Sequence, residues 1–173
     1  MEIRALRRSD DRSRFRSGEA DLDRFFHKYA GQNQFRHHIG TTYVAAEGDR
    51  ILGYLTVAPG ELEIDRLPAA IRKKLPRYPL PILRLARLAV EESARGQGLG
   101  GALLRFALKL TERLATGYGC VGVVVDAKPG AVEFYARFGF TPLEILEGHS
   151  TARPAPTTLF LAVSEIVAAR GGK

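Results

Sequence analysis

One segment of the chain, residues 82–114, constrains the fold more than any other. A hydrophobic run from Ile82 to Val90 precedes a glycine-rich turn, Arg95–Gly100, and the apolar residues that follow keep helical spacing. This order predicts a strand, a turn without bulky side chains, and a helix. The first N–H groups of a helix lack intrahelical partners and lie at the positive end of its dipole. The turn is therefore a candidate site for a phosphate or pyrophosphate group.

The rest of the chain predicts one domain around a mixed sheet. Apolar residues at helical spacing, from Leu22 to Tyr29, indicate an early amphipathic helix with one apolar face. The turn Gly48-Asp49 joins two β-rich stretches into a hairpin that we expect to end at Pro59-Gly60. Further strands are expected at residues 2–6, 120–126 and 157–163, and a further helix at residues 131–138. This order predicts a single α/β or α+β domain over residues 1–173, with a loose tail at 168–173.

Composition limits the classes of function. Hydrophobic residues make up 45% of the 173 residues, which is enough for a folded core. The single cysteine, Cys120, excludes an intrachain disulfide, and no Cys/His cluster has the spacing of a metal site. No stretch reaches the run of about 18 apolar residues that a membrane span needs, and the first residues do not form a signal peptide. We therefore expect a cytoplasmic protein with no metal and no membrane anchor.

Positive charge is concentrated before the glycine turn. The chain has a net charge of +7, and residues 66–87 include seven basic and no acidic side chains. Most runs of this kind form a solvated face. The position beside the turn favours the alternative, a surface that contacts a polyanion.

Three classes of phosphate ligand are compatible with a glycine turn. A P-loop ends in Gly-Lys-Ser/Thr, whereas Gly100 is followed by Gly-Ala, which excludes this class. The dinucleotide pattern GxGxxG is formally present at Gly96, Gly98 and Gly101. However, five residues separate Val90 from Gly96, and too little chain follows for the rest of a doubly wound sheet.

The third class is coenzyme A. The pattern Arg95-x-x-Gly98-x-Gly100 matches the Q/R-x-x-G-x-G/A signature of the GNAT N-acetyltransferase superfamily, and Ala131–Phe140 resembles the family's A-x-x-F-Y-x-x-x-G-F segment. The two motifs occur in the family's order. This resemblance implies a mixed central sheet flanked by helices, with two strands splayed around acetyl-CoA.

The resemblance also implies roles for individual residues. Backbone N–H groups of the turn would hold the pyrophosphate, the end of the preceding strand would pair with the pantetheine arm, and Tyr135 would protonate the departing thiolate. The residues assigned in this way to cofactor binding are Leu88, Ala89, Val90, Arg95, Gly96, Gln97, Gly98, Leu99, Gly100, Asp126 and Phe134.

A second interpretation of Tyr135 is a core aromatic residue. On a helix, Phe134 and Phe138 are i, i+4 partners that we expect to pack inward. Tyr135 is turned away from them by about 100°. This orientation favours the catalytic role over the structural one.

The strand before the turn also bears on the acceptor. Many protein-acetylating relatives carry a glutamate early in this strand, whereas residues 82–87 contain no carboxylate. A lysine amine, with a pKa of about 10.4, usually needs a base, but an α-amine, with a pKa of about 7.7–8.0, is substantially neutral near pH 8. The missing carboxylate therefore favours an acceptor amine of low pKa.

The chain further resembles the GNAT toxins of type II toxin–antitoxin modules, which acetylate the α-amine of aminoacyl-tRNA. The matching stretches include Leu22–Phe26, Gly53–Thr56, Pro79–Pro81 and Leu85–Val90. This resemblance implies an aminoacyl-tRNA substrate, a ribbon-helix-helix antitoxin as partner, and a homodimer. The tRNA surface would comprise Arg72, Lys73, Lys74, Arg77, Arg84 and Arg87. One alternative is a free-standing acetyltransferase for a small amine, a metabolite or a protein N-terminus. Another is a non-catalytic module for CoA binding or interaction with a protein partner, against which Tyr135 argues.

Overall fold

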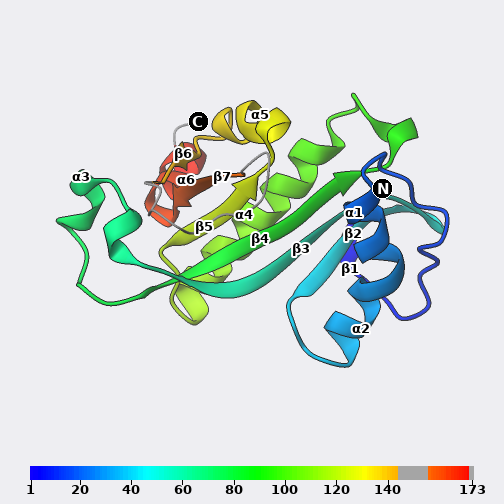
Figure 1. The fold of residues 1–173 in the computed structure, drawn as a ribbon, viewed down its shortest axis with the longest axis horizontal. Coiled ribbons are helices and arrows are strands. Elements are labelled where there is room, and N and C mark those ends of the chain that lie inside the picture. The colour runs from blue at the N-terminus through cyan, green and yellow to red at the C-terminus, as the bar shows by residue number, and fades with distance from the viewer. Residues whose placement is uncertain (144–155, 172–173) are drawn as a thin grey trace. The chain divides into compact units, whose positions relative to one another are not determined.

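The computed structural model describes residues 1–143 and 156–171. Across these residues a seven-stranded sheet has the order β1-β2-β3-β4-β5-β7-β6, with helices packed against it (Figure 1). The strands are β1 (Glu2–Ala5), β2 (Thr41–Glu47), β3 (Arg50–Leu62), β4 (Leu80–Val90), β5 (Gly122–Ala127), β6 (Thr141–Pro142) and β7 (Thr157–Ala162). The helices are α1 (Ala20–Arg24), α2 (Ala30–Phe35), α3 (Ala69–Arg72), α4 (Leu99–Gly117), α5 (Val132–Ala136) and α6 (Val163–Gly171). The predicted α/β architecture, a central sheet flanked by helices, is confirmed.

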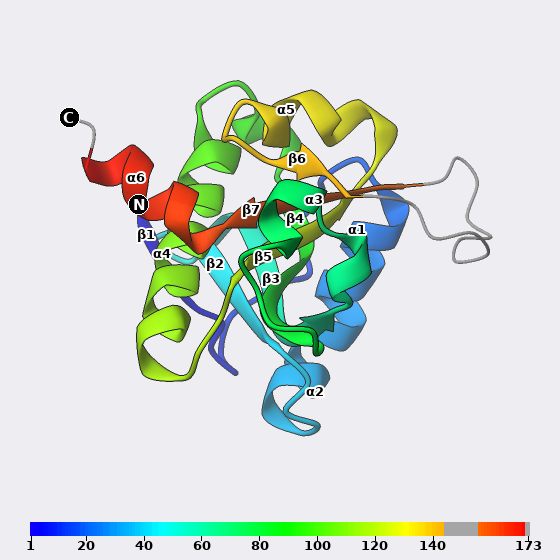
Figure 2. The same ribbon diagram turned by 90° about the vertical axis from the view of Figure 1, so that its left-hand side faces the viewer.

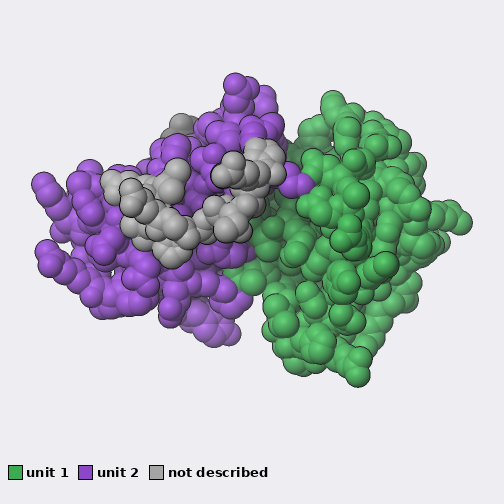
Figure 3. All heavy atoms as spheres, viewed as in Figure 1, with its two compact units in different colours: residues 1–58, 85–109 green, residues 59–84, 110–173 purple. Residues whose placement is uncertain are grey.

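The chain forms two compact units (Figure 3). Unit 1 comprises residues 1–58 and 85–109, and unit 2 comprises residues 59–84 and 110–173. Three elements, β3, β4 and α4, contribute residues to both units. One domain over residues 1–173, and a splay of two strands around a cofactor, stay predictions.

In unit 1, helices cover both faces of an antiparallel sheet (Figure 2). β1 pairs with β2, and β2 pairs with β3. Successive side chains of a strand point to opposite faces. Tyr43 therefore packs on Phe106 of α4, with 4.8 Å between ring centroids, while Val44 joins a cluster in which Phe26 and Tyr54 stack at 4.4 Å.

A π-helical turn, Phe25–Tyr29, lies between α1 and α2. A π turn closes i→i+5 hydrogen bonds and so shifts the helical phase; here the Ala30 N–H donates to the Phe25 carbonyl oxygen. Phe25 and Phe26 are buried, but Tyr29 is 44% exposed. The prediction that Tyr29 shares the apolar face is therefore wrong.

In unit 2, β7 pairs antiparallel with both β5 and β6. β3 does not end at Pro59-Gly60 as predicted, because it continues to Leu62. Leu62 is buried with Leu80 and Ile82 of β4 in one core cluster. Removing this apolar surface from water favours the longer strand.

The C-terminal residues also differ from the prediction. α6 extends to Gly171, so residues 168–171 are helical and do not form a loose tail; residues 172–173 lie outside the described residues. Arg170 of α6 pairs with Glu112 of α4 at 2.7 Å, a contact between residues far apart in the sequence. Within the described ranges, no helix combines the length and apolar character that a bilayer crossing requires.

Candidate functional site

The segment that follows β4 is anchored within unit 1. The Glu91 N–H donates to the Leu52 carbonyl oxygen of β3, and the Glu92 N–H donates to the Arg16 carbonyl oxygen, both at 2.8 Å. The Glu91 carboxylate caps a short 3-10 turn by accepting the Ser93 N–H at 3.1 Å. Hydrogen bonds from the Ser93 side chain and N–H hold the pKa of Glu91 below its ordinary value. The glycine turn therefore follows a segment whose backbone is held in place by hydrogen bonds.

Gly96 and Gly98 give the turn its shape. Both have a φ of +77°, in the left-handed region that costs other residues about 1–2 kcal/mol. A Cβ at either position would meet none of the described atoms within 4 Å, so open space lies where a side chain would point. The Gly98 carbonyl oxygen accepts the Ala102 N–H at 3.1 Å, and α4 begins there. The first N–H groups of α4 can therefore bind an anion.

Two side chains of the turn face the protein rather than open space. The Arg95 guanidinium donates to the Ser17 carbonyl oxygen, and Leu99 is 6% exposed and packs beside Gly53. At Arg95 and Leu99 it is therefore the backbone that can contact a ligand. The sequence does not predict this use of Ser17, because Ser17 lies 78 positions before Arg95 and no local pattern links the two.

The end of β4 supplies extended backbone before the turn. Ala89 is buried in the core of unit 1, and Leu88 and Val90 are half-buried. A Cβ at Gly53 would lie 2.9 Å from Leu103 Cδ1 and 3.1 Å from the Ala89 carbonyl oxygen, so β3 and β4 are closely packed there. Pairing of this backbone with a pantetheine arm stays a prediction.

In unit 2, helix α5 carries Tyr135. Pro129 starts a 3-10 turn that leads into α5. Tyr135 is 5% exposed, and its ring packs edge-on against Phe134 at 5.0 Å and Phe140 at 5.5 Å. Burial raises the pKa of Tyr135 to about 12, so the phenol stays protonated at neutral pH. A protonated phenol can donate its proton to a more basic group.

The predicted orientation of this aromatic group is wrong in one respect. Phe134 and Phe138 contact each other, with 5.5 Å between ring centroids, but both are half-buried while Tyr135 is buried. The reason is that α5 ends at Ala136, so Phe138 lies beyond the helix and the expected i, i+4 face stops short of it. Tyr135 is thus a core residue, and its role as a general acid stays a prediction.

Three charged residues of the predicted site have partners within the protein. The Asp126 carboxylate accepts a hydrogen bond from Thr158 Oγ1 at 2.6 Å and pairs with Arg84 at 3.3 Å. The side chains of Arg84 and Asp126 are 36% and 48% exposed, so the ion pair itself contributes at most about 1 kcal/mol. In unit 1, the Arg87 guanidinium lies 3.7 Å from the centroid of the Phe25 ring. Cofactor binding by Asp126 and RNA binding by the two arginines stay predictions.

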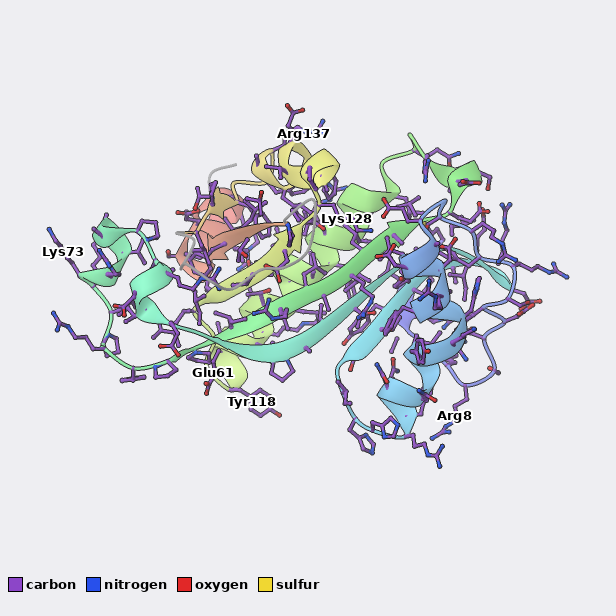
Figure 4. All side chains as sticks on the ribbon, viewed as in Figure 1. Arg8, Glu61, Lys73, Tyr118, Lys128 and Arg137 are labelled. Atoms are coloured by element: carbon purple, nitrogen blue, oxygen red, sulfur yellow. The ribbon has the colours of Figure 1, made fainter. Side chains whose placement is uncertain are left out.

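The remaining basic residues of the predicted polyanion surface lie on and after α3. Lys73, Lys74 and Arg77 are exposed and Arg72 is half-buried, and Figure 4 shows Lys73 pointing away from α3. An open hollow of about 610 Å³ is lined by Arg72, Lys73, Arg77, Tyr78, Glu63 and Asp65, among others. Two carboxylates therefore accompany the cations in this part of unit 2.

Comparison with known proteins identifies the family. Residues 38–142 match the family described as Acetyltransferase (GNAT) domain. The chain belongs to this family. It is also 32% identical over 138 residues to the tRNA-acetylating toxin of Mycobacterium tuberculosis, a match that covers 79% of this chain and 82% of that protein.

Two solved structures resemble this GNAT chain over nearly its whole length. AtaT complexed with acetyl-methionyl-tRNAfMet has a TM-score of 0.85 and 28% identity, covering 98% of both chains. A mutant AtaT toxin bound to the C-terminus of the antitoxin AtaR and to acetyl-CoA has a TM-score of 0.78 and 26% identity, covering 97% of this chain and 96% of that one.

Membership of the GNAT family decides among the three ligand classes. The protein is an N-acetyltransferase, and acetyl-CoA is its cosubstrate. The glycine turn fits this ligand, because Gly96 and Gly98 leave open space beside the first N–H groups of α4. The GxGxxG spacing is coincidental to a GNAT turn and marks no dinucleotide site. Among the described residues, no group of three or more His, Cys, Asp or Glu side chains is placed to hold a metal ion.

Proposed function

We propose that this GNAT enzyme is a toxin that acetylates the α-amine of aminoacyl-tRNA and so blocks translation. The observation that carries the proposal is the likeness to AtaT in complex with an acetylated methionyl-tRNA, over 98% of both chains. The 32% identity to a tRNA-acetylating toxin supports it. The absence of a carboxylate from residues 82–87 agrees with an acceptor that needs no base.

The proposed reaction gives roles to the glycine turn, the end of β4 and Tyr135. Backbone N–H groups from Arg95 to Gly100 hold the pyrophosphate, and the backbone of Leu88–Val90 pairs with the pantetheine arm. Acetyl-CoA supplies an acetyl group as a thioester, which the neutral α-amine attacks to form the amide. Tyr135 gives its phenolic proton to the sulfur as the carbon–sulfur bond breaks. The amine nitrogen releases one proton as the amide forms, and that proton returns through water to the tyrosine oxygen. Its pKa of about 12 keeps that proton in place beforehand.

The proposal extends to partners. The exposed Lys73, Lys74 and Arg77 contact tRNA phosphates, and residues 1–173 act as one acetyltransferase domain in a homodimer. The likeness to AtaT bound to the C-terminus of its antitoxin supports a protein inhibitor of the same kind. We assign that inhibitor to the ribbon-helix-helix class. Light scattering of the purified toxin gives its mass and thereby tests the homodimer.

A transfer assay with labelled acetyl-CoA tests the proposed activity. The purified protein should label at least one charged tRNA, and the label should leave with the amino acid after mild alkaline deacylation. The same tRNA without its amino acid is the matched control and should stay unlabelled. Label on a polyamine or on a peptide N-terminus, with none on any charged tRNA, would refute the tRNA proposal in favour of a free-standing acetyltransferase.

A further inference from the structure

Unit 1 carries a second basic surface that lies outside residues 66–87. A hollow of about 310 Å³ is lined by Arg7, Arg8, Arg12, Arg36, Gln32 and Phe35, together with Gly31. We call this surface the arginine hollow. Its lining contains four guanidinium groups and no carboxylate, in contrast to the hollow beside α3.

Neighbouring acidic residues are engaged elsewhere. Asp10 accepts two hydrogen bonds from the guanidinium of Arg4, each at 2.8 Å, and a third from the backbone N–H of Arg7 at 2.8 Å. Asp11 accepts from the Ser13 hydroxyl at 2.6 Å and from its N–H at 2.9 Å. Residues 24–46, which include α2, contain no Asp or Glu. Asp10 balances part of the charge of Arg7. Most of the positive charge of the arginine hollow is therefore left to attract a ligand from outside.

Two of the four guanidinium groups are held in place. The Arg12 guanidinium donates to the Phe26 carbonyl oxygen at 3.1 Å, and it fills the space over Gly31, where a Cβ would lie 2.9 Å from it. The Arg8 guanidinium lies 4.7 Å from the centroid of the Phe35 ring, and Figure 4 shows Arg8 beside α2. Ordering these side chains in advance lowers the entropy cost of binding.

The chemistry of the arginine hollow matches RNA. Guanidinium forks bind phosphate oxygens in pairs, and arginine is preferred to lysine where such paired recognition matters. An arginine stacked on an aromatic ring offers a flat platform for an unpaired base. An acidic peptide helix would need an apolar groove as well, but Phe35 is the one large apolar side chain in the lining and is half-buried.

We propose that the arginine hollow binds the RNA backbone, and that it holds the body of the acceptor RNA apart from the acetyl-transfer chemistry. The identity of that RNA as a charged tRNA rests on the proposed function. The binding of RNA itself does not, because direct binding can be measured with uncharged tRNA. The arginine hollow is thus a positioning surface that acts on the KM for a large acceptor.

The test is a triple variant, Arg7→Gln, Arg8→Gln and Arg36→Gln, in the full chain. Its matched control removes three exposed charges from α4 through Arg105→Gln, Lys109→Gln and Arg113→Gln. The triple variant should raise the Kd for uncharged tRNA at least tenfold, and the slope of log Kd against log salt should fall by about one for each phosphate that the variant no longer binds. The control should stay within about twofold of wild type, and the thermal midpoints of both variants should match wild type.

Activity gives a second readout. With aminoacyl-tRNA, the triple variant should show a raised KM and an unchanged kcat, while its rate with an aminoacyl-adenosine fragment should equal that of wild type. Unchanged tRNA binding, or equal weakening in the control, would overturn the proposal that the arginine hollow binds RNA, and it would leave the proposed function unaffected. Loss of binding to a polyglutamate peptide with tRNA binding intact would overturn it in favour of an acidic protein partner. If tRNA binding depends on the arginine hollow but no charged tRNA is acetylated, the RNA-binding proposal is upheld and the proposed function is rejected.

Discussion

The substitution Tyr135→Phe tests the catalytic step with little disturbance of the fold. It removes one hydroxyl group and keeps the ring, which packs against Phe134 at 5.0 Å and Phe140 at 5.5 Å. The unfolding free energy at pH 7 should therefore change by no more than about 1 kcal/mol. Acetyl-CoA binding should also persist, because the turn around Gly98 is untouched.

The expected loss of activity follows from the protonation of the phenol. The pKa of Tyr135 is about 12 instead of 10.0, a difference worth about 2.7 kcal/mol in favour of the protonated form. At pH 8 a phenol is almost fully protonated at either value, so the catalytic role depends on the position of the hydroxyl group rather than on the raised pKa. Loss of a positioned general acid slows turnover by about 10²–10⁴-fold, which corresponds to about 2.7–5.4 kcal/mol of barrier. We expect Tyr135→Phe to lower kcat for aminoacyl-tRNA by a factor of about 10²–10⁴.

The same pKa has a consequence for stability that can be measured separately. Because the folded-state pKa is raised, the contribution of Tyr135 is fully present below the unfolded-state value of about 10 and is lost as the pH rises through about 12. Between these values wild type should lose about 2 kcal/mol that Tyr135→Phe does not lose, and the full difference of about 2.7 kcal/mol is reached only above pH 12. Burial also raises the pKa of Tyr54, but this residue is present in both proteins, so their difference isolates Tyr135.

The assay compares three proteins: wild type, Tyr135→Phe and Tyr43→Phe. Tyr43 is a half-buried tyrosine that packs on Phe106 of α4, so its variant loses a hydroxyl without a proposed proton transfer and should keep wild-type kcat. Steady-state acetylation of a charged tRNA gives kcat, and urea unfolding from pH 7 to pH 12 gives stability. A folded Tyr135→Phe protein that keeps more than about a tenth of wild-type kcat would refute the assignment of the general acid.

Two further predictions concern the turn and the N-terminal ion pair. Gly98→Ala should cost about 1–2 kcal/mol of unfolding free energy, because the φ of Gly98 is +77°, and it should also weaken acetyl-CoA binding. The control Gly117→Ala, in open space and without a positive φ, should be neutral or stabilising in urea unfolding. Equal effects of the two substitutions would contradict a left-handed conformation at Gly98. Hydrogen bonds from Arg4 lower the pKa of Asp10, so this contribution is present above the unfolded-state value of about 3.9 and is lost as the pH falls through the lower folded-state value. Asp10→Asn should therefore lower the unfolding free energy by about 2 kcal/mol at pH 7, and this variant should lose less stability than wild type on acidification. Parallel acid-unfolding curves for the two proteins would argue against a stabilising Arg4–Asp10 ion pair.

Short-range requirements explain which parts of the fold can be predicted from the sequence. Where the backbone needs a positive φ or has no room for a Cβ, the residue at that position has to be suited to it, as glycine is at positions 96 and 98 with their positive φ. Apolar spacing likewise predicts α4, since one face of a helix repeats within a few residues. By contrast, the extension of β3 to Leu62 depends on a cluster with Leu80 and Ile82, and the exposure of Tyr29 follows from a π turn. Neither feature has a local signature in residue type.

The order of residues along the chain is sufficient for the strand–turn–helix segment, for the GNAT family with its acetyl-CoA cosubstrate, and for the motif position of Tyr135. Folding in three dimensions settles what surrounds the charged side chains. Arg95 binds the Ser17 carbonyl oxygen and Arg84 pairs with Asp126 across separations of 78 and 42 residues. Such contacts depend on where distant segments meet, and a charge looks the same in the sequence whether it is paired or free. This is why three arginines of the N-terminal segment and Arg36, directly after α2, line one hollow, although the basic run that stands out in the sequence lies elsewhere.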